Sequence, residues 1–224
     1  MEARDRLALA LDVDDLVEAM RLARLLRPWF GIAKVGLELY SAAGPETIGA
    51  VRSLGYSVFC DIKLHDIPNT VRGAARVLGS LGVDYLTIHA VGGEVMLRAG
   101  VEGLAEGADA AGVPAAGVLA VTILTSEGRR PPAVLAERVA AAVGAGCAGI
   151  VCSASDVREA KRLAPRLIAV VPGIRPEGVP AHDQAAPATP RAALDVGADI
   201  LVIGRAVTAA PDPSAAAAAL AQDV

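Results

Sequence analysis

The chain has 224 residues but only three cysteines, no long apolar run and no cluster of basic residues. Cys60, Cys147 and Cys152 are odd in number, lie among apolar residues and lack Cys-x-x-Cys spacing, so we expect buried free thiols and neither disulfides nor a zinc site. No run approaches the roughly 20 apolar residues that span a bilayer, and no signal-peptide core precedes the first apolar strand. These absences argue against a membrane protein and lead us to expect a cytoplasmic location.

Further absences narrow the kind of ligand. The formal net charge is −4, the sequence pI is about 5.4, and the arginines are scattered along the chain, which argues against a nucleic-acid surface. The three histidines have no His-x-x-x-His spacing, so a transition-metal site is not expected. Neither Gly-x-Gly-x-x-Gly nor a P-loop occurs, so no nucleotide cofactor is indicated. A small molecule is therefore the expected partner.

Apolar, β-branched runs recur along the whole chain and alternate with helical patterns rich in Ala, Leu and Arg. Nearly continuous hydrophobicity in each run is typical of a parallel strand covered on both faces. Eight runs at this length predict one α/β domain over residues 1–224, a closed (β/α)8 TIM barrel, with an open doubly wound sheet as the alternative. The predicted strands are 7–11, 32–35, 57–62, 85–88, 117–121, 149–151, 167–171 and 200–203, and predicted helices include 16–26, 70–81, 132–143, 154–163 and 189–196.

Polar or special residues follow nearly every predicted strand. In a barrel these carboxyl ends converge on one face, where the catalytic groups of such barrels lie. Residues far apart in sequence are therefore expected to line one pocket. The residues concerned are Asp12, Lys34, Asp61, Lys63, His89, Thr122, Thr125, Ser153, Pro172, Gly173, Gly204 and Arg205.

Lysine is also scarce: of 21 basic residues only Lys34, Lys63 and Lys161 are lysines, against eighteen arginines. Arginine does not release its proton near neutral pH, so we expect lysine where a proton-transferring ammonium group is needed. Lys63 lies between Asp61 and Asp66 at the end of an apolar run. On an extended strand Asp61 and Lys63 point to the same face, and Asp66 follows in a turn. Lys63 is thus a candidate acid.

The pattern Asp-x-Lys-x-x-Asp has two interpretations. Exposed ion pairs at strand ends are common and contribute little to stability, so a surface cluster is one of them. The other is a functional site, because buried-looking residues flank this segment and two carboxylates in a partly dry cleft would favour the protonated lysine.

Two glycine–arginine segments predict a phosphate site. Pro-Gly-Ile-Arg-Pro at 172–176 follows the seventh predicted strand, and Ile-Gly-Arg at 203–205 ends the eighth. Glycine allows a ligand to approach the backbone closely, and the guanidinium fork suits a phosphate dianion. Barrels often bind phosphate with the loops that follow strands 7 and 8.

The decapeptide Asp-Ile-Lys-Leu-His-Asp-Ile-Pro-Asn-Thr at 61–70 closely resembles the signature of the orotidine 5′-phosphate decarboxylase family. The resemblance covers nearly the whole chain, since further family motifs follow in order. These are Leu-Ala-Leu-Asp at 9–12, Lys-Val-Gly at 34–36, Thr-Ile-Leu-Thr-Ser at 122–126, Val-Cys-Ser-Ala at 151–154, Pro-Gly-Ile-Arg-Pro at 172–176, Asp-Gln at 183–184 and Val-Ile-Gly-Arg at 202–205.

The resemblance implies a role for each matching residue. It implies a charged network with Lys63 as the proton donor, formed by Lys34, Asp61, Lys63 and Asp66. It also implies that Asp12 and Lys34 contact the ribose, that Thr125 contacts the pyrimidine, and that Gln184, Gly204 and Arg205 bind the phosphate. Further substrate contacts are implied for Arg175, which belongs to the closing loop, and for Ile67 and Thr70.

The resemblance implies a homodimer in which Asp66, Ile67 and Thr70 reach into the neighbouring subunit's site. One departure from the family pattern is that Ala185 and Ala186 follow Gln184 where many members have a basic residue. The implied reaction converts orotidine 5′-phosphate to UMP without a metal or organic cofactor. The alternatives are a Mg²⁺-dependent sugar-phosphate enzyme that shares Asp-x-Lys-x-x-Asp, such as 3-keto-gulonate-6-phosphate decarboxylase or hexulose-6-phosphate synthase, and an inactive phosphate-binding barrel.

Overall fold

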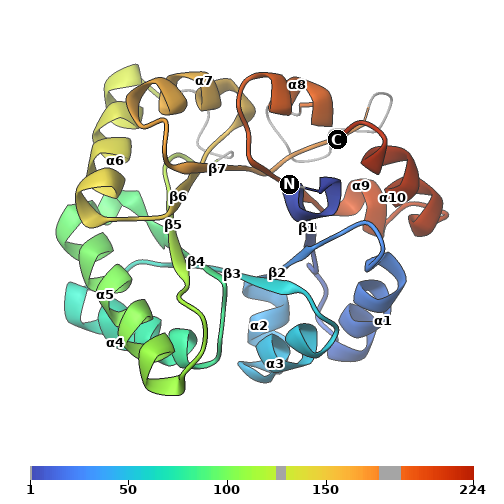
Figure 1. Ribbon diagram of the computed structural model, residues 1–224, viewed down its shortest axis with the longest axis horizontal. Coiled ribbons are helices and arrows are strands. Elements are labelled where there is room, and N and C mark those ends of the chain that lie inside the picture. The colour runs from blue at the N-terminus through green and yellow to red at the C-terminus, as the bar shows by residue number, and fades with distance from the viewer. Residues whose placement is uncertain (1, 125–129, 177–187) are drawn as a thin grey trace.

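The computed structural model describes residues 2–124, 130–176 and 188–224. Its strands form a closed parallel barrel in which each strand pairs with the next and β1 pairs with β8 (Figure 1). This confirms the predicted (β/α)8 barrel over the open doubly wound sheet. The strands are β1 Leu7–Ala10, β2 Ile32–Gly36, β3 Ser57–Leu64, β4 Tyr85–His89, β5 Gly117–Val121, β6 Gly149–Val151, β7 Ile168–Val171 and β8 Ile200–Ile203.

Helices surround the barrel and cover its outer surface (Figure 1). Within the described residues, none of them is both long and apolar enough to cross a membrane. The α-helices are α1 Leu16–Leu26, α2 Leu37–Ala43, α3 Glu46–Ser53, α4 Pro68–Ser80, α5 Gly93–Ala111, α6 Pro132–Ala145, α7 Ala154–Leu163, α8 Pro190–Asp195, α9 Arg205–Thr208 and α10 Pro213–Ala221, and short 3₁₀ turns are η1 Ala3–Arg6 and η2 Ala90–Gly92.

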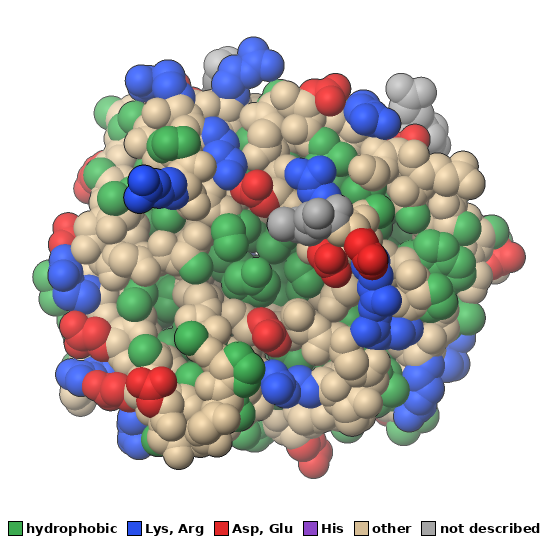
Figure 2. Space-filling view, in the orientation of Figure 1, with side chains coloured by type: hydrophobic (Ala, Val, Ile, Leu, Met, Phe, Trp, Pro, Cys, Tyr) green, Lys and Arg blue, Asp and Glu red, His purple; other side chains and the backbone are tan. Residues whose placement is uncertain are grey.

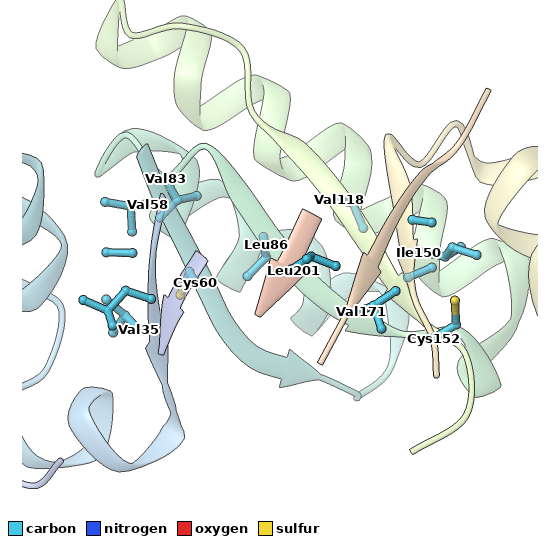
Figure 3. Packing of buried hydrophobic residues seen from close by; sticks show 14 of the residues in the cluster. Val35, Val58, Cys60, Val83, Leu86, Val118, Ile150, Cys152, Val171 and Leu201 are labelled. Atoms are coloured by element: carbon cyan, nitrogen blue, oxygen red, sulfur yellow. The ribbon is translucent and has the colours of Figure 1, made fainter. Parts of the chain in front are cut away.

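Each strand packs on both faces, which explains why the runs are apolar without alternation. In β1, Ala8 and Ala10 belong to a cluster inside the barrel, whereas Leu7 and Leu9 belong to the larger cluster between strands and helices. Figure 3 shows part of the larger cluster on several strands. The three cysteines are buried and free, as predicted.

Charged side chains of both signs are interspersed on the face seen in Figure 2. Two aspartates among the charged residues have a structural role at the beginning of strands. Asp84 precedes β4 and accepts a hydrogen bond from the backbone N–H of Val58 (2.8 Å), and Asp199 precedes β8 and accepts one from Ala169 (2.7 Å). Each carboxylate thus ties its strand to the preceding one.

Helices α4 and α5 pack with their backbones unusually close together. A Cβ atom on Gly103 or Gly107 of α5 would collide with the carbonyl oxygen of Arg72 or Arg76 of α4. Glycine has a low helix propensity, but Gly103 and Gly107 of α5 lack side chains and so let the backbone of α4 approach. This contact fixes α4, whose first turn follows the decapeptide's charged residues.

We predict that Gly107→Ala lowers the free energy of unfolding by about 1–3 kcal/mol, since the new methyl group meets backbone that cannot move aside. The matched control is Gly49→Ala in α3, where a Cβ meets nothing within 4 Å. That change should stabilise the protein by about 0.5–1 kcal/mol through helix propensity and a less flexible unfolded chain. Urea unfolding of the two variants checks this. Equal effects would contradict the close helix contact.

Candidate active site

A cavity of about 460 Å³ lies where the carboxyl ends of the strands converge. Its apolar wall includes Ala10, Phe59 and Val121 of the cluster inside the barrel. Residues predicted from five different strand ends also line it, as the barrel fold requires. They are Asp12, Lys34, Asp61, Lys63, Pro172, Gly173, Arg175, Gly204 and Arg205.

Four of these residues form a continuous ion network. The Lys34 ammonium lies 2.8 Å from Oδ1 of Asp12 and 3.4 Å from Oδ2 of Asp61. Oδ1 of Asp61 is in turn 2.8 Å from Nζ of Lys63. Charges therefore alternate along the network, and each interior member has a partner of opposite sign on both sides.

Burial makes this pairing necessary, because Lys34 and Asp61 are each only 8% exposed. Burial alone raises the pKa of Asp61, but the ammonium groups of Lys34 and Lys63 outweigh it and hold the pKa below its usual value. For Lys34, burial alone lowers the pKa, and the carboxylates of Asp61 and Asp12 outweigh it, so that pKa is raised. Both groups are thus charged at neutral pH.

Gly36, at the end of β2, makes room for the outer ion pair. A Cβ there would lie 2.8 Å from Oδ1 of Asp12 and 2.9 Å from Nζ of Lys34. Any larger residue would displace one of these charged atoms. Gly36 therefore contributes to the site because its lack of a side chain leaves room for both charged groups.

The prediction that β3 ends at Ile62 was wrong, because the strand continues to Leu64. The expected extended conformation of Lys63 was wrong as well. Lys63 has a φ of 50°, so it is not extended, and strand alternation alone does not bring its side chain to Asp61. A register shift between Cys60 and Leu64 in the pairing with β4 accompanies this conformation.

Thr87, in β4, is a site residue that no sequence pattern indicates. The hydroxyl of Thr87 donates a hydrogen bond to Oδ1 of Asp61 (3.1 Å) and accepts one from the backbone N–H of Lys63 (2.9 Å). Threonine is common in strands, so its presence in an apolar run signals strand structure and gives no hint of a polar contact.

Asp66, Ile67 and Thr70 lie past β3 and are exposed, and none of them is among the residues lining the cavity. Oδ1 of Asp66 accepts the backbone N–H of Ile67 at 2.6 Å. Among the described residues no ion pair joins Asp66 to Lys63, so the expectation of two carboxylates around Lys63 is not met within one chain.

The two predicted phosphate segments both reach the cavity. Gly204 and Arg205 line it at the end of β8, and Arg175, 6% exposed, lines it after β7 and donates to the carbonyl of Ile174 at 2.8 Å. The structure thus brings both arginines to one cavity. Six residues of the predicted motifs and site lie outside the described residues, namely Thr125, Ser126, Asp183, Gln184, Ala185 and Ala186.

The fold and the site together define a class of protein: a (β/α)8 barrel with a lysine–aspartate network, buried at Lys34 and Asp61, and two arginines at the open ends of its strands. Within the described part of the chain, no group of three or more His, Cys, Asp or Glu residues is placed to hold a metal ion. A model of the Orotidine 5′-phosphate decarboxylase / HUMPS family matches residues 5–220, and the chain belongs to this family.

Individual relatives agree with this assignment. The orotidine 5′-phosphate decarboxylase of Moorella thermoacetica is 44% identical over 236 residues, which cover 100% of this chain and 94% of the relative. That of Anaeromyxobacter sp. is 45% identical and covers 99% of each chain. The crystal structure of orotidine 5′-phosphate decarboxylase from Lactobacillus acidophilus has 34% sequence identity and a TM-score of 0.78, covering 98% of this chain and 99% of that one.

We predict that Asp61→Asn lowers the free energy of unfolding by about 3 kcal/mol at pH 7, because it leaves the buried ammonium of Lys34 and the partly buried ammonium of Lys63 without their shared carboxylate. The folded-state pKa of Asp61 lies below its unfolded value near 4, so its contribution is present above about pH 4 and is lost as the pH falls through the folded pKa. The stability difference between wild type and variant should therefore shrink from pH 6 to pH 3.

Chemical unfolding at a series of pH values measures this difference. Asp109→Asn, at an exposed carboxylate of α5, is the matched control for the loss of one negative charge. A difference for Asp61→Asn that stays constant with pH would contradict the electrostatic account of the network.

Proposed function

We propose that the protein decarboxylates orotidine 5′-phosphate to UMP, the last step of de novo UMP synthesis, without a metal or organic cofactor. The observation that carries this proposal is the Lys63 ammonium group held 2.8 Å from Asp61 on the wall of the cavity. An acid fixed in a largely apolar pocket is what a carbanion reaction requires. Membership of the family and the names of the full-length relatives support the same substrate.

In the proposed reaction the bond between C6 and the carboxylate carbon breaks, CO₂ leaves, and the electron pair stays on C6. The Lys63 ammonium stabilises this developing charge and then transfers a proton to C6, which leaves a neutral amine that regains its proton from solvent. Asp61 lies beside the departing carboxylate, and repulsion between the two negative groups disfavours the bound substrate relative to the transition state.

The remaining residues bind the nucleotide away from C6. Asp12 and Lys34 hold the ribose hydroxyls, Gly204, Arg205 and Arg175 take the phosphate side, and the proposed roles of Thr125 with the pyrimidine and Gln184 with the phosphate complete the set. Contacts to the phosphate then provide binding energy that assists a reaction at a distant atom.

The proposal includes a homodimer with composite sites and a cytoplasmic location. Asp66, Ile67 and Thr70 would contact the substrate bound by the partner subunit. Their exposure supports this role, since Ile67 is 66% exposed and the three residues do not line their own chain's cavity.

The direct test is the loss of ultraviolet absorbance of orotidine 5′-phosphate in the presence and absence of EDTA. We expect turnover that EDTA does not affect. Turnover of a sugar phosphate that stops with EDTA and returns with Mg²⁺ would favour the sugar-phosphate enzymes instead. Binding without turnover would favour the inactive barrel.

We predict that Lys63→Ala reduces kcat to less than a few per cent of wild type, roughly the effect of removing a catalytic acid that also stabilises charge. Lys63→Arg should be nearly as inactive, because guanidinium keeps its proton and does not fit a site built for a compact ammonium. Circular dichroism checks that both variants fold. Substantial activity in Lys63→Ala would remove Lys63 from the proposed role.

We predict that two inactive variants, Asp66→Asn and Lys63→Ala, regain activity when they share a dimer. If Asp66 serves the partner's pocket, a mixed dimer has one pocket with both changes and one with neither. At equal expression about half the dimers are mixed, so roughly a quarter of wild-type activity should return from an isologous dimer. Co-expression with two different affinity tags isolates the mixed dimers. Purified mixed dimers without activity would contradict composite sites.

A further inference from the structure

We propose that Thr87 is a positioning residue whose hydroxyl sets the geometry of the Asp61–Lys63 pair and thereby the rate of proton delivery. This inference rests on the proposed function. Thr87 is 0% exposed and lies in the middle of β4. It is not among the residues lining the cavity, so it acts through its two neighbours and not on the substrate.

The side chain of Thr87 faces the inside of the barrel. Leu86 and Ile88, on either side of it in β4, belong to the cluster between strands and helices, whereas Tyr85 packs against the inner cluster. Because side chains alternate along a strand, Thr87 shares the inward direction of Tyr85. Its hydroxyl is therefore placed toward the charged end of β3.

One hydroxyl group makes two contacts with the pair. It is 3.1 Å from Oδ1 of Asp61, to which it donates, and it accepts the backbone N–H of Lys63 at 2.9 Å. Nζ of Lys63 contacts the same Oδ1 atom of Asp61 at 2.8 Å. Thr87 thus holds the carboxylate oxygen that binds the Lys63 ammonium, and it also holds the backbone N–H of Lys63 directly.

The backbone at Lys63 needs such support. Cys60 pairs with Leu86 and Leu64 pairs with Ile88. Between these two pairs β3 advances by four residues and β4 by only two, so β3 bulges. Within this bulge Lys63 has a φ of 50°, and among the described residues it is the single non-glycine with a positive φ. The bulge interrupts the regular ladder, and the Thr87 hydroxyl supplies an acceptor for the Lys63 N–H.

The test compares Thr87→Val with Thr87→Ser in the 224-residue protein acting on orotidine 5′-phosphate. Valine keeps the shape and removes the hydroxyl, so we expect kcat to fall about 10- to 100-fold, the range for losing a hydrogen bond to a charged group. KM should change less than about threefold, because no substrate contact is removed. Serine keeps the hydroxyl and should retain kcat within about threefold of wild type.

The matched control is Thr47→Val in α3, another fully buried threonine, whose hydroxyl donates to the carbonyl of Gly44 at 2.8 Å. Its kcat should remain that of wild type. If Thr87→Val does not fold, Thr87→Ala removes the same hydroxyl with a smaller side chain. Wild-type kcat without the hydroxyl, an equal loss in Thr87→Ser, or a change confined to KM would each overturn the inference.

Amide hydrogen exchange at Lys63 provides a readout that does not depend on activity. We expect faster exchange in Thr87→Val than in wild type and Thr87→Ser, since the acceptor of that N–H is lost. Failure of the wild type to act on orotidine 5′-phosphate would contradict the proposed function, and exchange would then decide alone whether Thr87 holds Lys63. Unchanged exchange would overturn the positioning role.

Discussion

The site depends on one buried carboxylate, Asp61, that lies between the ammonium groups of Lys34 and Lys63. A carboxylate that is 8% exposed is costly to keep charged unless such partners compensate for lost water. With Asp12 the network contains two negative and two positive groups, so it is neutral as a whole while each charge stays fixed. Such preorganised charges can stabilise a developing carbanion without rearranging first.

The barrel is what makes this network possible. Asp12 follows β1, Lys34 lies in β2 and Asp61 lies in β3, and parallel pairing of these strands places the three side chains at one open end of an apolar interior. The apolar interior excludes water from the side of the network that faces the barrel, and this strengthens the electrostatic interactions between the charged groups. Gly36 contributes by leaving space, and the close packing of α5 on α4 holds the segment that follows Lys63.

Much of this arrangement could be predicted from sequence, and the parts that could not have a physical reason. The eight apolar runs predicted the barrel because two-sided burial leaves a continuous signal. Lys63 was apparent from the scarcity of lysine, and Asp61 from its position two residues before Lys63. The conformation of Lys63 and the role of Thr87 were not, because both arise from the irregular pairing of β3 with β4, which depends on tertiary contacts. Helix propensity likewise does not predict Gly103 and Gly107 in the middle of α5, and the close approach of α4 explains these two glycines.

The central claim is that this cavity places C6 of the nucleotide against Lys63 and its phosphate against the end of β8. A crystal structure of the protein with UMP tests it most directly. The account predicts Nζ of Lys63 at about 3 Å from C6, a contact distance that allows proton transfer, and the phosphate on the backbone of Gly204 and the guanidinium of Arg205. UMP bound in the cavity with its phosphate away from Arg205, or with C6 out of reach of Lys63, would contradict it.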